Sequence, residues 1–346
     1  MATDRFTDQM QAYGRWRNDL IDAISRYREW LEANGMSSPE TELRIFELVE
    51  ALKSDRLTIA FVAEFARGKT ELINAIFFSE YDRRLLPSEA GRTTMCPTEL
   101  FYDSDADESY IRLLPIETRL EEKSIQEFKQ EPIHWTTIKL DTDSAEAMAE
   151  SFKEVIKTKR VPAPVAARLG LHDPEAADAA EMIEIPMWRH AMISFPHPLL
   201  KEGLTILDTP GLNALGNEPE LTINMLPAAQ AVIFVLAADT GVTQSDLEMW
   251  QSFVQPLGTD AKHSRLVVLN KVDTLWDELK GEEAVQQSIQ SQCKSVAKML
   301  DLDEQAIFPV SAQKGLLAKI RTDQELLARS NILALESILS RDILPR

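Results

Sequence analysis

Short apolar runs alternate with helical segments over most of the chain, and this alternation limits the possible folds more than any other feature. Each run is a few residues long and is followed by a loop. The runs cover residues 57–62, 204–207, 231–237, 266–269 and 307–310, and helices are expected at 69–79, 219–228, 243–254 and 281–300. Such alternation predicts an α/β fold, with a doubly wound, mainly parallel sheet covered by helices on both faces.

Amphipathic helices are expected on both sides of this region. Residues 5–33 carry apolar side chains at helical spacing, and a second helix is expected from Pro39 to about Lys53, with Ser38 as its N-cap. The tail at 323–343 is also expected to be a helix. Because apolar stripes must be buried, we expect both N-terminal helices to pack against this tail. The predicted domains are residues 1–55, 56–320 and 321–346.

The alternation of apolar runs and helices becomes irregular after the first run. We expect an inserted helical segment at about residues 101–187. Two helices are predicted inside it, near 118–130 and 144–159. Its composition indicates no chemistry, so a structural elaboration is the simplest interpretation. Residues 189–197 are expected to form an antiparallel edge strand that pairs with 204–207 through the turn KEG.

The segment AEFARGKT lies between the first apolar run and the helix after it, and it has the features of a phosphate-binding loop. Its backbone N–H groups and the helix N-terminus would face phosphate oxygens. Lys69 would reach the β- and γ-phosphates, and the Thr70 hydroxyl would bind Mg²⁺. Ala63 stands where the usual pattern has its first glycine. The predicted phosphate contacts are Ala63, Glu64, Phe65, Ala66, Arg67, Gly68, Lys69 and Thr70.

Three further motifs follow later strands. LDTPG offers Asp208 to Mg²⁺ through water and the Gly211 N–H to the γ-phosphate. NKVD offers the Asp273 carboxylate to two donors that guanine has and adenine lacks, with the stem of Lys271 against the base. SAQK offers the Ala312 N–H to guanine O6. The other predicted base contacts are Asn270 and Ser311.

All four motifs lie at the carboxyl ends of predicted strands, where open α/β sheets bind ligands, so the sequence predicts a guanine-nucleotide site. Between the first two motifs lies LPSEAGRTTMCPTEL, in which Thr93 or Thr94 would close over the γ-phosphate and Mg²⁺. Arg67 could neutralise charge in the transition state, point to solvent or contact a partner subunit.

Charge and cysteine content exclude several classes of protein. The formal net charge is −19 and the sequence pI is about 4.8, so no overall positive field attracts nucleic acid. The two cysteines suit a reducing compartment and match no zinc site. No run approaches the ~20 apolar residues that a membrane span needs. We therefore expect a cytoplasmic protein that binds no nucleic acid.

The chain resembles a dynamin-like GTPase of the bacterial type, which has the P-loop GTPase fold. The resemblance covers about residues 57–320 and rests on FVAEFARGKTELINAIFF, LLPSEAGRTTMCPTE, LTILDTPGLN, AVIFVLAADTGVTQSDLEMW and NKVDTLWDELK. It implies Mg²⁺-dependent hydrolysis of GTP to GDP and phosphate, homodimerisation through the GTPase domains and membrane remodelling. It favours Thr94 over Thr93 as the threonine that closes over the γ-phosphate and Mg²⁺. It is also compatible with a monovalent cation as a second cofactor.

The resemblance also implies that the helices on both sides of the GTPase domain form a helical bundle, called the neck. It implies that the C-terminal neck helix is truncated. Peripheral contact with the inner membrane would then use regions absent here. The predicted catalytic residues are Thr94, Lys69, Gly211 and Arg67, and the predicted metal ligands are Thr70, Thr94 and Asp208. The alternative function is a slow nucleotide-gated module that recruits a cytosolic partner such as chromosome or division machinery.

Overall fold

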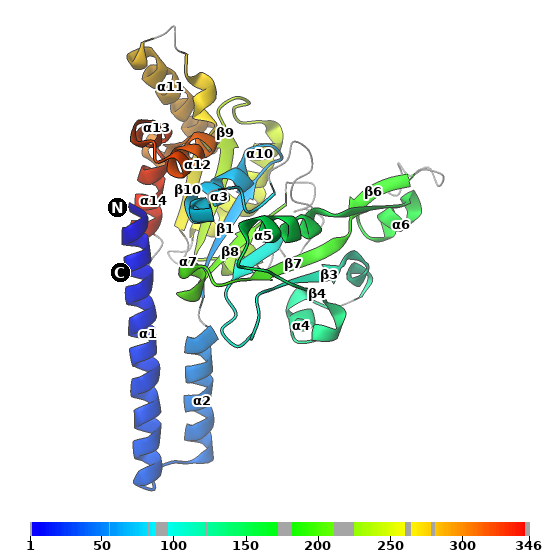
Figure 1. Cartoon of the computed structure of the whole chain (residues 1–346), viewed down its shortest axis with the longest axis vertical. Coiled ribbons are helices and arrows are strands. Elements are labelled where there is room, and N and C mark those ends of the chain that lie inside the picture. Colours follow the sequence, from blue (N-terminus) through cyan, green and yellow to red (C-terminus); the bar gives the residue numbers. More distant parts are fainter. Residues whose placement is uncertain are drawn as a thin grey trace.

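The computed structural model has a nine-stranded sheet at its centre, helices on both faces, and a long helical projection at one end (Figure 1). It describes residues 2–54, 56–81, 83–87, 96–121, 123–171, 182–210, 225–259, 264–277 and 281–342. The strands are β1 (Leu57–Ala63), β2 (Thr98–Phe101), β3 (Tyr110–Pro115), β4 (Thr136–Lys139), β5 (Thr158–Pro162), β6 (Met182–Pro186), β7 (Trp188–Ser194), β8 (Leu204–Asp208), β9 (Ala231–Ala237), β10 (Ser264–Asn270) and β11 (Ile307–Pro309).

Helices connect and cover these strands. The α-helices are α1 (Ala2–Ala33), α2 (Pro39–Ser54), α3 (Lys69–Phe77), α4 (Ile125–Lys129), α5 (Ala145–Phe152), α6 (Ala163–Arg168), α7 (Pro198–Lys201), α9 (Leu226–Ala228), α10 (Gln244–Met249), α11 (Glu282–Leu300), α12 (Ala312–Arg321), α13 (Gln324–Ser330) and α14 (Ile332–Asp342). The 3-10 turns are η1 (Ser79–Tyr81), η2 (Ile116–Leu120), η3 (Pro132–His134), η4 (Lys153–Ile156), η7 (Gln255–Thr259), η8 (Val272–Leu275) and η9 (Glu304–Ala306), and η6 (Trp250–Val254) is a π-helical turn.

The sheet has the order β11-β10-β9-β1-β8-β2-β7-β3-β4. All neighbours from β11 to β8 are parallel, and these five strands are the five apolar runs of the sequence. Beyond them, β2 is antiparallel to β8 and parallel to β7, and β3 and β4 continue antiparallel to the edge. The predicted α/β fold is confirmed, since the sheet is mostly parallel, has an antiparallel part and is flanked by helices.

Successive side chains of the parallel strands enter two different cores, because a strand alternates its side chains between the faces of the sheet. In β1, Ile59 and Phe61 pack in the core with α3, α12 and α14, whereas Ala60 and Val62 pack on the other face with α10 and α11. All four side chains are fully buried. Burial on both faces explains why these strands are continuous apolar runs in the sequence.

The flanking helices meet, but not entirely as expected. α1 packs against α14, as predicted, whereas α2 lies along the far part of α1, away from α14 (Figure 1). Ser38 caps α2 as predicted, since its Oγ accepts the Thr41 N–H at 3.2 Å. The tail is two helices rather than one, because Asn331 has a φ of 58° and separates α13 from α14. None of the described helices is long and apolar enough to cross a membrane.

The inserted segment is not purely helical, which corrects the prediction. β3 and β4 extend the main sheet, and β5 and β6 form a separate antiparallel ribbon that projects from the body beside α6 (Figure 1). The helices predicted near 118–130 and 144–159 each divide into two short elements, η2 with α4 and α5 with η4. Ser124 causes the first division, because it starts α4 with a capping box that includes Glu127.

The predicted pairing of residues 189–197 with 204–207 is wrong. β7 pairs with β2 and β3, and β2 lies between β7 and β8. Pro198 begins the short helix α7 before the turn KEG, so the chain does not fold back as a hairpin. Of the helix predicted at 219–228, residues 219–224 lie outside the described ranges.

A buried charge cluster attaches β2 to the inserted segment. Glu99 of β2 accepts hydrogen bonds from Lys129 Nζ at 2.7 and 3.0 Å and lies 3.0 Å from His190 Nε2. Burial alone would raise the pKa of Glu99, but Lys129 and His190 outweigh it and lower that pKa to about 2. The cluster therefore holds a carboxylate that stays ionised inside the protein.

Candidate functional site

The predicted phosphate loop joins β1 to α3 at the carboxyl edge of the parallel strands. Gly68 has a φ of 81°, and a Cβ on it would lie 2.4 Å from Asn270 Nδ2, so a side chain at this position would collide with the amide. That amide donates to the carbonyl oxygens of Arg67 at 3.0 Å and Gly68 at 3.3 Å. The last residue of β10 therefore holds the shape of the phosphate loop.

Ala63, the departure from the usual glycine, fits without strain. It is the last residue of β1 and is buried in the core. Among the described non-glycine residues, those with positive φ include Ala66 at 62° but not Ala63. The backbone at Ala63 is one that any L-residue adopts, so the lost glycine carries no backbone penalty there.

Lys69 and Asp208 meet at the buried centre of the site. Lys69 Nζ contacts Asp208 Oδ1, and each side chain is less than one tenth exposed. Burial lowers the pKa of the Lys69 ammonium to about 7, while the adjacent carboxylate favours its charged form. The pair places a cationic group that suits phosphate oxygens directly beside a carboxylate that suits a hard cation.

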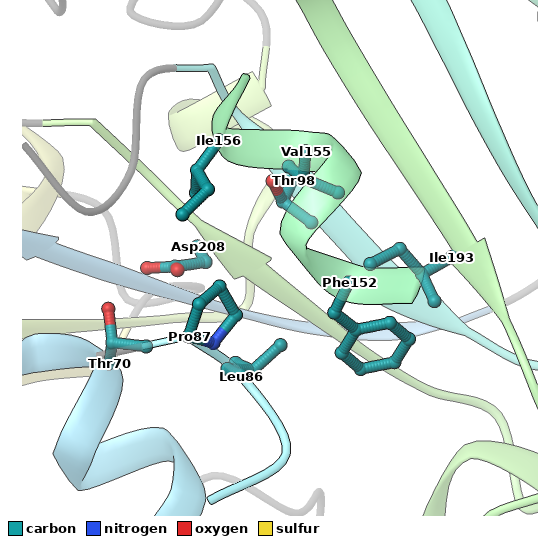
Figure 2. A pocket seen from close by; sticks show the side chains of 9 residues that line it. All are labelled: Thr70, Leu86, Pro87, Thr98, Phe152, Val155, Ile156, Ile193 and Asp208. Carbon is teal, nitrogen blue, oxygen red and sulfur yellow. The ribbon is translucent and has the colours of Figure 1, made fainter. Parts of the chain in front are cut away.

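Thr70 and Asp208 line one cavity at this end of the site (Figure 2). The other lining residues are Leu86, Pro87, Thr98, Phe152, Val155, Ile156 and Ile193. Mg²⁺ prefers oxygen ligands, and proteins commonly hold it by one or two carboxylates while waters and substrate phosphates complete the shell. A hydroxyl and a carboxylate on facing elements therefore fit Mg²⁺, and the metal-ligand roles of Thr70 and Asp208 stay predictions.

Arg67 points from the phosphate loop to α10 rather than to solvent. Its Nε and Nη2 donate to the Asp246 carboxylate at 3.1 and 2.7 Å, and its Nη atoms also donate to Thr240 at 2.7 Å and Thr243 at 3.1 Å. The side chains of Arg67 and Asp246 are 7% and 0% exposed. The catalytic role predicted for Arg67 therefore requires its guanidinium to leave this buried pair.

The predicted base contacts lie together at the ends of β10 and β11. Asn270 Oδ1 accepts the Ala312 N–H at 3.0 Å, and Ser311 Oγ donates to Asp273 at 2.6 Å. Lys271 has a φ of 61° and its ammonium lies 3.0 Å from Asp239. The hydrogen bond from Ser311 holds the Asp273 carboxylate in one orientation, which a specific base contact requires.

Three of the predicted residues lie outside the described ranges, and one residue that contacts the phosphate loop was not predicted. Thr93, Thr94 and Gly211 lie outside the described ranges, so their predicted roles stay predictions. The sequence analysis missed Asp246, although Thr243 and Asp246 have capping-box spacing and do form the box at the start of α10. That spacing locates a helix start but does not reveal that the carboxylate faces Arg67.

Comparisons with known proteins identify the family of the chain. The model of the dynamin family matches residues 59–272. The "Probable transmembrane GTPase FZO-like, chloroplastic" of Arabidopsis thaliana is 34% identical over 128 residues, which are 37% of this chain and 13% of that protein. Mitofusin-2 of Rattus norvegicus is 22% identical over 318 residues, which are 89% of this chain and 34% of that protein. The chain thus spans a minor part of the length of these relatives.

A solved structure shares the fold. It is described as "An oligomerised bacterial dynamin pair provides a mechanism for the long range sensing and tethering of membranes", and it superimposes with a TM-score of 0.54 at 16% identity. The match covers 95% of this chain and 43% of that chain. The flanking helices are therefore included in the similarity, together with the sheet.

Proposed function

The chain belongs to the dynamin family, a family of GTPases, and on that premise we propose that it binds GTP at the carboxyl edge of the parallel strands and hydrolyses it to GDP and phosphate. The side chain of Asn270 carries this proposal. Its amide donates to the phosphate loop, while its carbonyl oxygen accepts from Ala312 in the loop after β11. The proposed nucleotide contacts the phosphate loop with its phosphates and the loop after β11 with its base. Asn270 would hold these two loops in register for one ligand.

Guanine recognition is assigned to Asp273. Guanine presents an N1–H and a 2-amino group to one carboxylate, whereas adenine has an acceptor at N1 and no 2-amino group. Ser311 orients that carboxylate, and the stem of Lys271 lies against the base. The Ala312 N–H donates to Asn270 Oδ1 in the structure, so its assigned bond to guanine O6 requires that the N–H be shared between the two oxygens. Adenine offers the Asp273 carboxylate no donor in place of the N1–H and the 2-amino group, so ATP is rejected.

The phosphate end is assigned to Lys69, Thr70 and Asp208. Lys69 binds the β- and γ-phosphates, and Thr70 and Asp208 hold Mg²⁺. When bound, Mg²⁺ neutralises charge on the transferring phosphoryl group. Thr94 is assigned to orient the attacking water through its carbonyl oxygen, and Gly211 to donate its N–H to the γ-phosphate.

The proposal extends to assembly and location. Residues 56–320 form the GTPase domain, residues 1–55 and 321–346 belong to a neck, and the GTPase domains dimerise across their nucleotide faces. Hydrolysis is coupled to membrane remodelling through peripheral contact. Family membership supports these assignments, as does the solved relative whose description names an oligomerised pair and the tethering of membranes.

Steady-state GTP turnover at increasing protein concentration tests the proposal, with Lys69→Ala as the inactive control. Specific activity that rises with concentration is expected for a dimerising GTPase, and replacing Na⁺ by K⁺ shows whether a monovalent cation takes part. A flat, near-zero rate would favour the nucleotide-gated recruitment module. Turnover that is equal in wild type and Lys69→Ala would contradict the assignment of the phosphate loop.

A further inference from the structure

The turn η4, in the middle of the inserted segment, reaches the metal end of the nucleotide site. Phe152, Val155 and Ile156 line the same cavity as Thr70 and Asp208 (Figure 2). The cavity measures about 20 Å³, which is room for a single water molecule. A segment whose sequence indicates no chemistry thus supplies one wall of the site.

Contacts on both sides hold η4 in place. Cys96 Sγ lies 3.8 Å from the Val155 carbonyl oxygen, to which it donates, and Trp188 Nε1 donates to the Glu154 carbonyl oxygen at 2.8 Å. Phe152 is fully buried, and its ring centroid lies 6.0 Å from that of Phe195. Because the backbone and the base of the turn are fixed, the apolar side chains of η4 keep a defined position beside Thr70 and Asp208.

We propose that Ile156 is a positioning residue that forms an apolar wall over the terminal-phosphate end of bound GTP. The inference rests on the proposed function, because Thr70 and Asp208 mark the terminal phosphate only if GTP binds as proposed. Phe152 and Val155 are buried in the protein, whereas Ile156 is partly exposed and is the member of the three that a ligand reaches best.

An apolar wall at this position acts on the triphosphate and not on the diphosphate. It keeps bulk water away from the γ-phosphate, which strengthens the interactions of that phosphate with charged groups. The base and the β-phosphate of GDP bind through Asp273 and the phosphate loop, which Ile156 does not form. Ile156 therefore controls the preference for GTP over GDP as well as the hydrolysis rate.

Equilibrium binding of GDP and of a non-hydrolysable GTP analogue, both with Mg²⁺, tests the wall directly. Ile156→Asp should weaken binding of the analogue by about tenfold or more, because the new carboxylate repels the γ-phosphate. Binding of GDP should weaken by no more than about twofold. Ile156→Ala should lower the single-turnover rate while GDP affinity stays the same. The matched controls are Ile133→Asp and Ile133→Ala, because Ile133 belongs to the same inserted segment but is 90% exposed on η3; they should change neither affinity nor rate.

The outcomes separate the wall from a folding defect and from the proposed function. Ile156→Leu keeps an apolar side chain and should retain the wild-type preference for the analogue. Equal weakening of both nucleotides by Ile156→Asp, or no change in either, would overturn the inference while GTP binding by the wild type stands. A wild-type protein that binds neither nucleotide would remove the proposed function, and this inference with it.

Discussion

Replacing Asp246 with alanine should destabilise the protein, because the Arg67 guanidinium would stay buried without its carboxylate. The two side chains are 0% and 7% exposed, so water cannot compensate for the lost partner. Removing one member of a buried ion pair costs about 3–5 kcal/mol. The Asp246 carboxylate also accepts the Thr243 N–H at 2.9 Å, so the substitution removes that half of the capping box of α10 as well.

Urea unfolding measures this loss. With an m-value of about 3 kcal/mol/M for a chain of this size, the midpoint should fall by about 1–1.7 M. Asp107→Ala is the control, because Asp107 is exposed and such substitutions stay within about 0.5 kcal/mol. The double replacement Arg67→Met with Asp246→Leu should recover most of the stability, since it removes both charges. A midpoint for Asp246→Ala equal to that of Asp107→Ala would refute the reasoning from burial.

Three further predictions concern single residues. Thr94→Ala should keep GTP binding but lower hydrolysis roughly 10²-fold, because it removes the hydroxyl that would bind Mg²⁺ when the loop closes over the γ-phosphate, and that closure positions the water mainly in the transition state; an active Thr94→Ala beside an inactive Thr93→Ala would exchange the two roles. Ala66→Gly should raise the free energy of unfolding by about 1 kcal/mol, since Ala66 has a φ of 62°, and a lower melting temperature would contradict this. The pKa of Glu99 falls from 4.5 to about 2 on folding, so its contribution to stability is complete above pH 4.5 and is lost as the pH falls toward 2. Glu99→Gln should therefore cost about 3 kcal/mol at pH 7 and little near pH 2, and an equal loss at both pH values would exclude this account.

The parallel half of the sheet could be predicted because its signals are local. Each strand is buried on both faces, so β1 and β9 are unbroken apolar runs that stand out in the sequence. The phosphate loop and the base motifs follow these strands directly, and a parallel sheet brings its carboxyl ends to one edge. The contacts of Asn270 and Ser311 are thus a consequence of strand order.

The remaining features depend on contacts between distant segments, which no local pattern specifies. Arg67 and Asp246 are 179 residues apart in the sequence, and their pairing depends on how β9 lies beside β1. β2 is only four residues long, so its insertion between β7 and β8 could not be seen in the sequence. The two polar and two apolar residues of η4 show no periodicity, and its place beside Asp208 is set by tertiary packing.

Equilibrium binding of GTP and ATP to the wild type and to Asp273→Asn tests the central claim most directly, because it depends on the base site and not on assembly or catalysis. The wild type should bind GTP at least about 10²-fold more tightly than ATP. Asp273→Asn should weaken the binding of GTP and favour the binding of a xanthine nucleotide, since the amide offers a donor to the 2-oxo group of xanthine. Equal affinity of the wild type for GTP and ATP would contradict the assignment of a guanine-specific site.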